Sequence, residues 1–200
     1  MRLIKLLFLF LLIFGSCHKA TTENKVVKIK IIKNVFVNKR ELALIPEKGR
    51  WFFEGKTFNG FAMMHHANKK VAERIGYFNG RKEGEALRYF EDGNLQKKAY
   101  YNQNKLDRKQ LVFWRNGNIA SESNYENGTK NGVQNYWFEN GQLAKRTNLK
   151  EGKENGLQRA WLQNGKIYVN YEAKNGRTFG LQRANLCYQL KNEKIEESRK

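Results

Sequence analysis

The side chains best suited to metal binding or nucleophilic catalysis in this sequence are three histidines and two cysteines. His65 and His66 are adjacent, so on a strand they would point to opposite faces and could not bind one metal ion together. The third histidine, His18, lies in a polar stretch near the start of the chain, and Cys187 lies near its other end. These spacings predict no metal site and no catalytic set. We interpret His65 and His66 as substitutes for aromatic residues.

The acidic residues and the glycines do not indicate acid–base or phosphate chemistry either. The carboxylates of Glu83, Glu85, Glu91 and Glu126 are spread along expected strand edges and turns, as solubilising charges are. No glycine-rich loop leads into a helix, which is the arrangement that binds phosphate groups. The sequence therefore predicts a non-enzymatic protein with no cofactor and no metal ion.

The chain is strongly basic, with 38 Lys and Arg residues against 19 Asp and Glu residues and a formal charge of +19. Such an excess favours anionic partners: nucleic acid, anionic lipid headgroups or an acidic protein. The basic residues are scattered through the chain without a strong run, so we expect no nucleic-acid binding. A solvated, self-repelling surface that keeps an exposed sheet soluble stays an alternative interpretation.

The N-terminus is typical of an exported bacterial protein. A short cationic start precedes nine apolar residues at 6–14, too few to cross roughly 30 Å of hydrocarbon at about 1.5 Å per helical residue. Residues 1–16 are thus predicted to be a signal peptide. Gly15-Ser16-Cys17 resembles a lipobox, which implies acylation of Cys17. Phe14 stands where leucine is usual, so ordinary signal-peptide cleavage stays an alternative.

Acylation of Cys17, for example by palmitate, would anchor the protein in a membrane of the cell envelope, at the outer membrane or facing the periplasm. Buried acyl chains contribute about 0.8 kcal/mol per CH₂, so several chains hold firmly. Cys187 would then have no disulfide partner, and it is either a reactive thiol or a small apolar filler. We expect a tether at 17–25, a strand or cap segment at 26–52, a repeat array at 53–190 and a polar tail at 191–200.

The repeat array is defined by residues that recur every 24 positions. Three ladders of glycines keep one register: Gly84, Gly132, Gly156 and Gly180; Gly93, Gly117, Gly141 and Gly165; Gly80, Gly128, Gly152 and Gly176. Arg108 and Asn104 fill missing positions of these ladders. Pairs of large apolar residues follow the same period: Tyr89-Phe90, Phe113-Trp114, Trp137-Phe138 and Trp161-Leu162. A period of this length predicts an array in which each unit packs on its neighbours.

Each repeat contains two turn signals. Dipeptides such as Asp92-Gly93 and Asn116-Gly117 lie between apolar segments and predict two-residue type I′ hairpin turns, with positive φ at both residues. A second turn, such as Asn79-Gly80, connects one hairpin to the next. The predicted fold is all-β: an elongated, single-layer antiparallel sheet of tandem hairpins, with strands about 4.8 Å apart.

Two-residue turns also predict which residues share a face. They place Phe90 opposite Leu95, Trp114 opposite Ile119, Phe138 opposite Leu143 and Leu162 opposite Ile167. The same face would carry Tyr101 opposite Gly84 and Leu149 opposite Gly132. The other face would carry a row formed by Tyr89, Phe113, Trp137 and Trp161, bordered by Lys98, Glu122, Arg146 and Arg159. The four rings of this row, with Arg146 and Arg159, are the candidate binding residues.

Two interpretations of this aromatic row stay open. Each ring can bury roughly 150–250 Å², and a one-layer sheet has nothing behind it to cover them. In the first, the rings stack on one another in a curled sheet, which is a structural role. Alternatively, they form a binding surface for a protein, a glycan or a membrane.

The pattern resembles the MORN-variant repeat, which also occurs in proteins of the YwqK antitoxin family. The residues that carry the resemblance are Tyr136-Trp-Phe-Glu-Asn-Gly-Gln-Leu143 and Tyr125-Glu-Asn-Gly-Thr-Lys-Asn-Gly132, within a region from about 53 to 188. The resemblance implies an elongated sheet of hairpins that binds proteins or membrane lipids, with no catalytic residue. Classical MORN units have a shorter Tyr-x-Gly spacing than Tyr125 to Gly128, so lipid recognition is not carried over residue by residue.

Two functions from different classes follow as hypotheses. The first is a lipid-anchored interaction module that binds a protein partner, for example an acidic one, in an antitoxin-like, immunity-like or scaffolding role. The second is a module that binds envelope glycans or anionic lipids, because aromatic rows suit sugars and cations suit phosphate groups.

Overall fold

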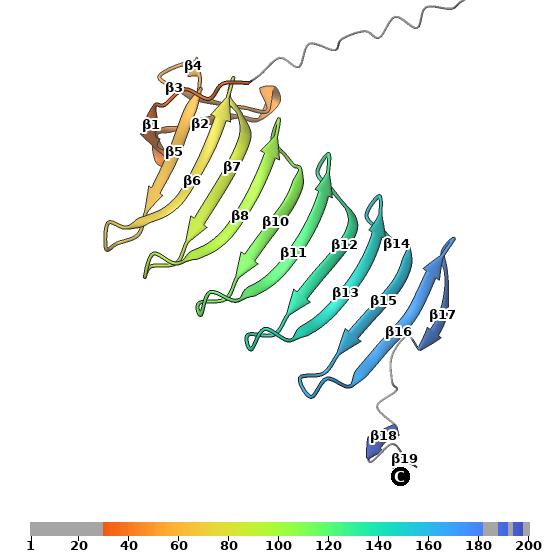
Figure 1. Ribbon diagram of the computed structural model, residues 1–200. Coiled ribbons are helices and arrows are strands. Elements are labelled where there is room, and N and C mark those ends of the chain that lie inside the picture. Colours follow the sequence, from red (N-terminus) through yellow and green to blue (C-terminus); the bar gives the residue numbers. More distant parts are fainter. Residues whose placement is uncertain (1–29, 182–187, 192–193, 198–200) are drawn as a thin grey trace, which may run out of the picture.

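The computed structural model describes residues 30–181, 188–191 and 194–197 and confirms the all-β prediction. Its main feature is a 14-stranded sheet in which hairpins follow one another along the chain (Figure 1). All strand pairs are antiparallel except β1 with β5. The strands of this sheet are β1 (Phe36–Asn38), β5 (Gly60–His65), β6 (Val71–Phe78), β7 (Arg81–Tyr89), β8 (Leu95–Asn102), β9 (Lys105–Leu106), β10 (Arg108–Phe113), β11 (Ile119–Glu126), β12 (Thr129–Trp137), β13 (Leu143–Lys150), β14 (Lys153–Glu154), β15 (Gly156–Trp161), β16 (Ile167–Lys174) and β17 (Arg177–Leu181).

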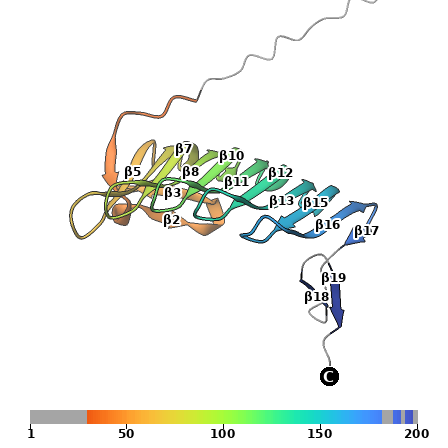
Figure 2. The ribbon, with the colours of Figure 1, turned by 60° about the horizontal axis from the view of Figure 1, so that its bottom comes forward.

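The sheet is a single open layer, as Figure 2 shows, with a smaller element at each end. Before β5 lie the 3₁₀ helices η1 (Lys39–Glu41) and η2 (Pro46–Lys48) and a small sheet of β2 (Ala43–Ile45), β3 (Arg50–Phe53) and β4 (Lys56–Thr57). Near the C-terminus, β18 (Tyr188–Lys191) pairs with β19 (Lys194–Glu197). The predicted signal peptide, the acylated Cys17, the tether and Cys187 lie outside the described residues and stay predictions.

The turns that contain the Asx-Gly dipeptides are longer than predicted. In the turn after β7, the Gly93 amide donates to the Phe90 carbonyl, and the Phe90 amide donates to the Asn94 carbonyl, both at 2.9 Å. Gly93 has φ +96°, but Asp92 does not have a positive φ. This is a three-residue loop, a type I turn closed by a glycine bulge, and the predicted type I′ turn is wrong here.

A side-chain hydrogen bond explains why the longer turn forms. The Asp92 carboxylate accepts the Asn94 amide at 2.8 Å, which holds Asp92 in the turn and leaves only Gly93 in the left-handed region. The same bond recurs in the turns of Asn68, Asn116, Asn140 and Asn164.

The type I′ geometry occurs instead in the short turns that connect successive hairpins. Asn79 and Gly80, Asn127 and Gly128, and Asn175 and Gly176 all have positive φ at both positions. A bulge with a positive-φ glycine follows turns of this kind at Gly84, Gly132 and Gly156. Gly180 also has a positive φ, but the β16–β17 pairing around it shows no register shift. Arg108 takes the same position with φ +60°, so the missing glycine leaves the backbone conformation of that repeat unchanged.

The longer turns shift the register, and one part of the predicted pairing is wrong as a result. Leu95 lies opposite Tyr89 and not opposite Phe90. The other repeats agree: Phe113 pairs with Ile119, Trp137 with Leu143 and Trp161 with Ile167, in place of Trp114, Phe138 and Leu162. The pairs that lie far from this turn, Gly84 with Tyr101 and Gly132 with Leu149, are confirmed.

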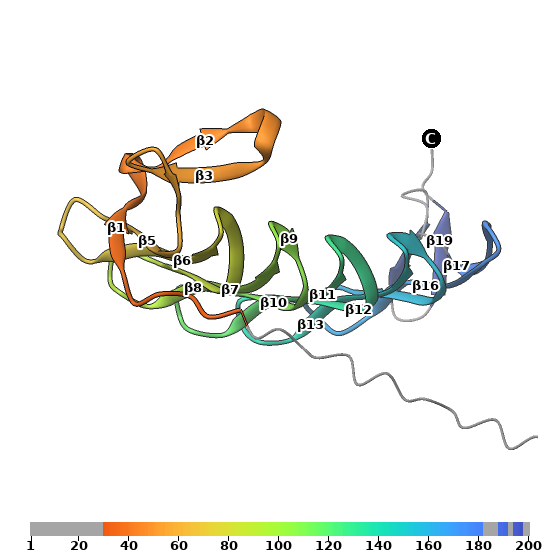
Figure 3. The same ribbon diagram turned by 90° about the horizontal axis from the view of Figure 1, so that it is seen from above.

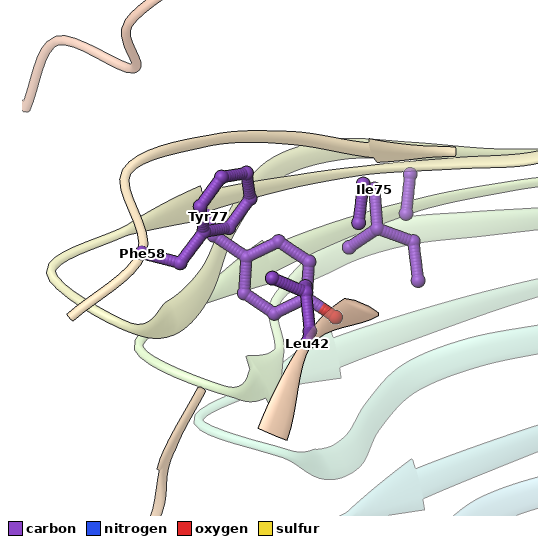
Figure 4. Packing of buried hydrophobic residues seen from close by; sticks show 6 residues of the cluster. Leu42, Phe58, Ile75 and Tyr77 are labelled. Atoms are coloured by element: carbon purple, nitrogen blue, oxygen red, sulfur yellow. The ribbon is translucent and has the colours of Figure 1, made fainter. Parts of the chain in front are cut away.

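The hydrophobic core lies at the N-terminal end, where the segment 39–58 covers one face of the sheet (Figure 3). We call this face the capped face; it carries the cross-strand row Ala62, Ile75, Ala86 and Ala99 and, beside it, Tyr77. Leu42 and Phe58 of the capping segment pack on Tyr77 and Ile75 (Figure 4). The Trp51 amide donates to the Gly80 carbonyl at 2.7 Å and ties the capping segment to the first short turn.

Beyond the cap, buried polar side chains replace the apolar core. Gln134 is fully buried in the bulge between β11 and β12, where its amide nitrogen donates to the Asn124 carbonyl at 3.1 Å and its oxygen accepts the Asn124 amide at 3.2 Å. Gln158 and Asn148 repeat this arrangement one unit later. Glu83 is also buried and accepts the Gln103 amide at 3.1 Å, so its interpretation as a solubilising charge is wrong.

Candidate functional site

The face opposite the cap carries the predicted aromatic row, and we call it the aromatic face. Tyr89, Phe113, Trp137 and Trp161 occupy equivalent positions in four successive hairpins. All four rings are partly buried, which a row of side chains on an open sheet achieves only by covering one another and the backbone. The corrected register adds the aliphatic residues Leu95, Ile119, Leu143 and Ile167 to this same row.

These aliphatic residues make the row more apolar than the sequence predicted. Ile119 is 36% exposed and Ile167 43% exposed, so both add accessible apolar surface beside the rings. A two-residue turn would instead place them on the other face. The signal that places them correctly is the Asx residue three positions before the first strand residue, whose side chain accepts the amide two residues on and favours the three-residue loop.

A second row crosses the aromatic face beside the aromatic one. Cross-strand pairing links its members one after another, from Leu87 and Lys98 through Leu111, Glu122, Asn135, Arg146 and Arg159 to Asn170. The structure therefore places all the predicted bordering residues on the predicted face. Arg146 and Arg159 prove to be direct neighbours, facing each other across β13 and β15.

The ion pairs formed by described residues of the aromatic face lie in its N-terminal half, although Glu172 also lies on this face in the C-terminal half. In the N-terminal half, Glu85 pairs with Arg74 at 3.4 Å and with Lys98 at 2.6 Å, and Glu122 pairs with Lys109 at 3.0 Å. In the C-terminal half, neither Arg146 nor Arg159 forms an ion pair with a described carboxylate. Arg159 donates from Nε to the Asn170 side-chain oxygen at 3.3 Å, and both arginines are exposed.

Like charges placed directly opposite each other on a sheet are destabilising. The Arg146–Arg159 pair, with Trp137 and Trp161 in the adjoining row, forms a cationic aromatic surface that the fold itself does not neutralise. We call these four residues the arginine–tryptophan patch. Its chemistry suits carboxylate or phosphate groups, which arginine binds through two parallel hydrogen bonds.

The turns along one edge of the sheet are joined by hydrogen bonds between successive hairpins. The Trp114 indole donates to the Trp137 carbonyl at 3.2 Å, and one His66 ring nitrogen lies 3.0 Å from the Tyr89 carbonyl. Because a carbonyl only accepts, this nitrogen of His66 donates as the Trp114 indole does. His66 thus occupies the aromatic position of its repeat, and it forms a hydrogen bond to the next hairpin equivalent to that of Trp114.

The described residues contain no group of three His, Cys, Asp or Glu side chains placed to hold a metal ion. Nor does any helix within the described part of the chain have the length and apolar character needed to span a membrane.

A family model described as MORN repeat variant matches residues 82–103, 109–127 and 130–151, so the predicted resemblance is confirmed for three repeats. MORN repeats generally serve protein or membrane interactions and are not catalytic. No curated protein matches this sequence. The YwqK-type relationship stays a prediction.

Two solved structures show partial similarity. One is a Glycosylation Associate Protein complex from Streptococcus agalactiae, with 21% identity, 62% of this chain and 22% of that chain covered, and a TM-score of 0.30. The other is accessory secretory protein 1, 2 and 3 in Streptococcus pneumoniae, with 15% identity, 68% and 23% covered, and a TM-score of 0.30. This chain spans less than a quarter of the length of either.

Proposed function

We propose that this protein is a non-enzymatic, lipid-anchored interaction module of the bacterial cell envelope, and that its arginine–tryptophan patch binds an acidic segment of a protein partner. The observation that carries the proposal is the direct opposition of Arg146 and Arg159 on a face where no described carboxylate neutralises them. A partner that supplies carboxylates would turn this unfavourable pair into charge-assisted hydrogen bonds.

The neighbouring rings supply the other half of a protein-binding surface. Tryptophan and arginine are enriched among the residues that dominate binding energy at protein interfaces. Trp137 and Trp161 are successive rings of the aromatic row with Leu143 of β13 between them, and the exposed Ile167 pairs with Trp161. An acidic segment with apolar side chains at alternate positions matches this arrangement, because its carboxylates and its apolar groups would reach the two rows separately.

The cellular setting of the proposal rests on the sequence of the N-terminus. The apolar stretch at 6–14 followed by Gly15-Ser16-Cys17 supports export and acylation of Cys17. An anchor of this kind would hold the repeat array close to a membrane of the envelope. A tethered binding surface of this kind would suit an antitoxin-like, immunity-like or scaffolding role.

The test uses a defined acidic probe and a matched pair of neighbouring residues. The probe is a fluorescein-labelled octapeptide of alternating glutamate and leucine, titrated with the purified protein and followed by fluorescence anisotropy. Arg146→Gln should weaken binding at least tenfold. Lys145→Gln is the control, because Lys145 is equally exposed but lies on the capped face opposite Tyr136.

Equal losses for Arg146→Gln and Lys145→Gln would mean that only net charge matters, and would refute the proposed patch. Vesicles of phosphatidylglycerol and a chitin oligosaccharide are the competing probes. If either one binds in an Arg146-dependent manner while the acidic peptide does not, the patch serves envelope lipid or glycan and the protein-partner proposal is wrong.

A further inference from the structure

A second feature that could bind a ligand lies on the capped face, away from the arginine–tryptophan patch. It is a depression of about 100 Å³ beside the capping segment, formed by β6, β7 and β8. Its floor consists of Ile75, Ala86 and Ala99, which lie side by side across the three strands. The depression exists because two of these neighbours are alanines, whereas the rows on either side carry long side chains.

The walls of the depression carry three cations, together with Glu73, Leu87 and Tyr101. Lys97 and Arg88 face each other across β7 and β8 on one side, and Lys82 lies on the other side, 5.2 Å from the Tyr101 ring centroid. The one carboxylate that lines it is Glu73, which already forms an ion pair with Lys39 of the capping segment. Lys82, Arg88 and Lys97 form no ion pair with any described carboxylate.

One tyrosine, Tyr101, lines the depression directly. Tyr77 lies opposite Lys82 across β6 and β7, but it is fully buried and does not line the depression. The depression therefore offers one tyrosine beside its three cations.

The pKa values of two of these cations, Lys82 and Lys97, are lowered, mainly by burial, and Glu73 partly opposes the shift. Burial lowers the pKa of Lys82 below its usual value, and the positive charge of Lys39 lowers it further. The pKa of Lys97 is also lowered, first by burial and then by Arg88. Both ammonium groups are held partly out of water near other cations, and a bound anion would relieve this repulsion.

We propose that this depression is a binding site for one small tetrahedral oxyanion, namely inorganic phosphate or a soluble phosphomonoester. Three unpaired cations converge on it, so a doubly charged anion matches its charge better than a single carboxylate does. Its volume of about 100 Å³ leaves room for one phosphate group.

The shape of the molecule favours a soluble anion over a phospholipid headgroup. The capping segment stands out from the sheet on the same face as the depression (Figure 3). A flat bilayer surface would therefore meet the capping segment before it reached Lys82 or Lys97. A small solute has no such restriction.

The test measures binding of inorganic phosphate to the purified protein by isothermal titration calorimetry in chloride buffer. The expected result is a one-to-one isotherm that Lys82→Met/Lys97→Met weakens at least tenfold. Lys145→Met is the control, because Lys145 is an exposed cation of the same face outside the depression. A second variant, Ala99→Leu, keeps every cation but fills the floor, and it should also lose phosphate.

Folding of each variant is checked by its circular dichroism spectrum and melting temperature. Retention of phosphate binding in both the double variant and a folded Ala99→Leu would overturn the proposal. The proposal would also be overturned if about 10 mM phosphate did not bind to the unmodified protein, because this concentration would nearly saturate a site with a dissociation constant of about 1 mM. Binding to phosphatidylglycerol vesicles without binding to free phosphate would overturn the assignment to a soluble anion. The Lys82→Met/Lys97→Met variant should still bind the acidic octapeptide, so this site and the patch are tested separately.

Discussion

The opposed arginines allow a prediction in which stability and binding change in opposite directions. Replacing Arg146 by glutamate places a carboxylate directly opposite Arg159. At about 6 Å, two unit charges in water interact by about 0.7 kcal/mol, so reversing one sign changes the pair energy by about 1.4 kcal/mol. Screening over a Debye length of about 10 Å at 0.1 M salt reduces this to roughly 0.8 kcal/mol. Arg146→Glu should therefore stabilise the sheet while it abolishes binding of the acidic octapeptide.

The assay is urea denaturation followed by tryptophan fluorescence. Long repeat arrays can depart from two-state unfolding, so transition midpoints are compared instead of extrapolated free energies. Lys145→Glu is the matched control, because it makes the same change in net charge at an exposed site whose cross-strand neighbours are Tyr136 and Ala160. Arg146→Glu should raise the midpoint above that of Lys145→Glu.

Two results would refute this reasoning. If both variants shift the midpoint equally, the gain comes from the lower net charge and not from the Arg146–Arg159 pair. If Arg146→Glu lowers the midpoint below that of the unmodified protein, the arginine stabilises the sheet through contacts that outweigh the repulsion. In that case its unpaired state would not be evidence for a partner.

Three further predictions concern the backbone, the buried amides and pH. Gly132→Ala should destabilise the protein by about 1–2 kcal/mol, because Gly132 has φ +80°. The cost comes from the backbone conformation alone, since a Cβ at this position would meet no atom within 4 Å. Urea denaturation measures the loss of stability, and no change would mean that the bulge tolerates another conformation. Gln134→Leu should lower the stability by about 1–3 kcal/mol in the same assay, because the backbone amide and carbonyl of Asn124 lose their hydrogen-bond partner. An unchanged stability would show that water replaces the Gln134 side chain. Folding lowers the pKa of Lys82 and Lys97 below the usual value of 10.5. Between the lowered and the usual pKa, the unfolded chain therefore binds more protons than the folded chain. The stability of the folded protein should rise with pH in that window. Phosphate affinity should fall over the same window as the lysines lose charge; calorimetry across this range tests it, and a constant affinity would exclude both lysines as ligands.

The sequence was sufficient to predict the hairpin array, because the 24-residue period appears in glycines. The backbone conformation of each turn or bulge requires a glycine or a tolerant substitute at these positions. The left-handed positions after the short turns need glycine or a tolerant substitute, so Gly84 and Gly132 mark them directly. The dipeptide Asp92-Gly93 was ambiguous, since it suits a type I′ turn and also a type I turn with a glycine bulge. The deciding factor is the hydrogen bond from the Asn94 amide to Asp92, which no count of glycines reveals.

The candidate sites were predictable to different degrees. The aromatic row and its bordering charges follow from period and alternation, and the structure places Trp137, Trp161, Arg146 and Arg159 on one face. The phosphate site depends on packing that has no sequence period. Lys39 reaches Glu73 only because the capping segment folds back over β6.

The position of the core at one end gives the array an expected gradient of local stability. The apolar cluster of Leu42, Phe58, Ile75 and Tyr77 holds the first hairpins, whereas β17 is the last strand of the sheet and Phe179 within it is 58% exposed. In a linear array each unit is stabilised mainly by its neighbours, so opening begins where one neighbour is missing. Amide hydrogen exchange should be slowest in β5 to β7 and become steadily faster toward β16 and β17. Proteases would then shorten the protein from that side, leaving the hairpins under the cap until last.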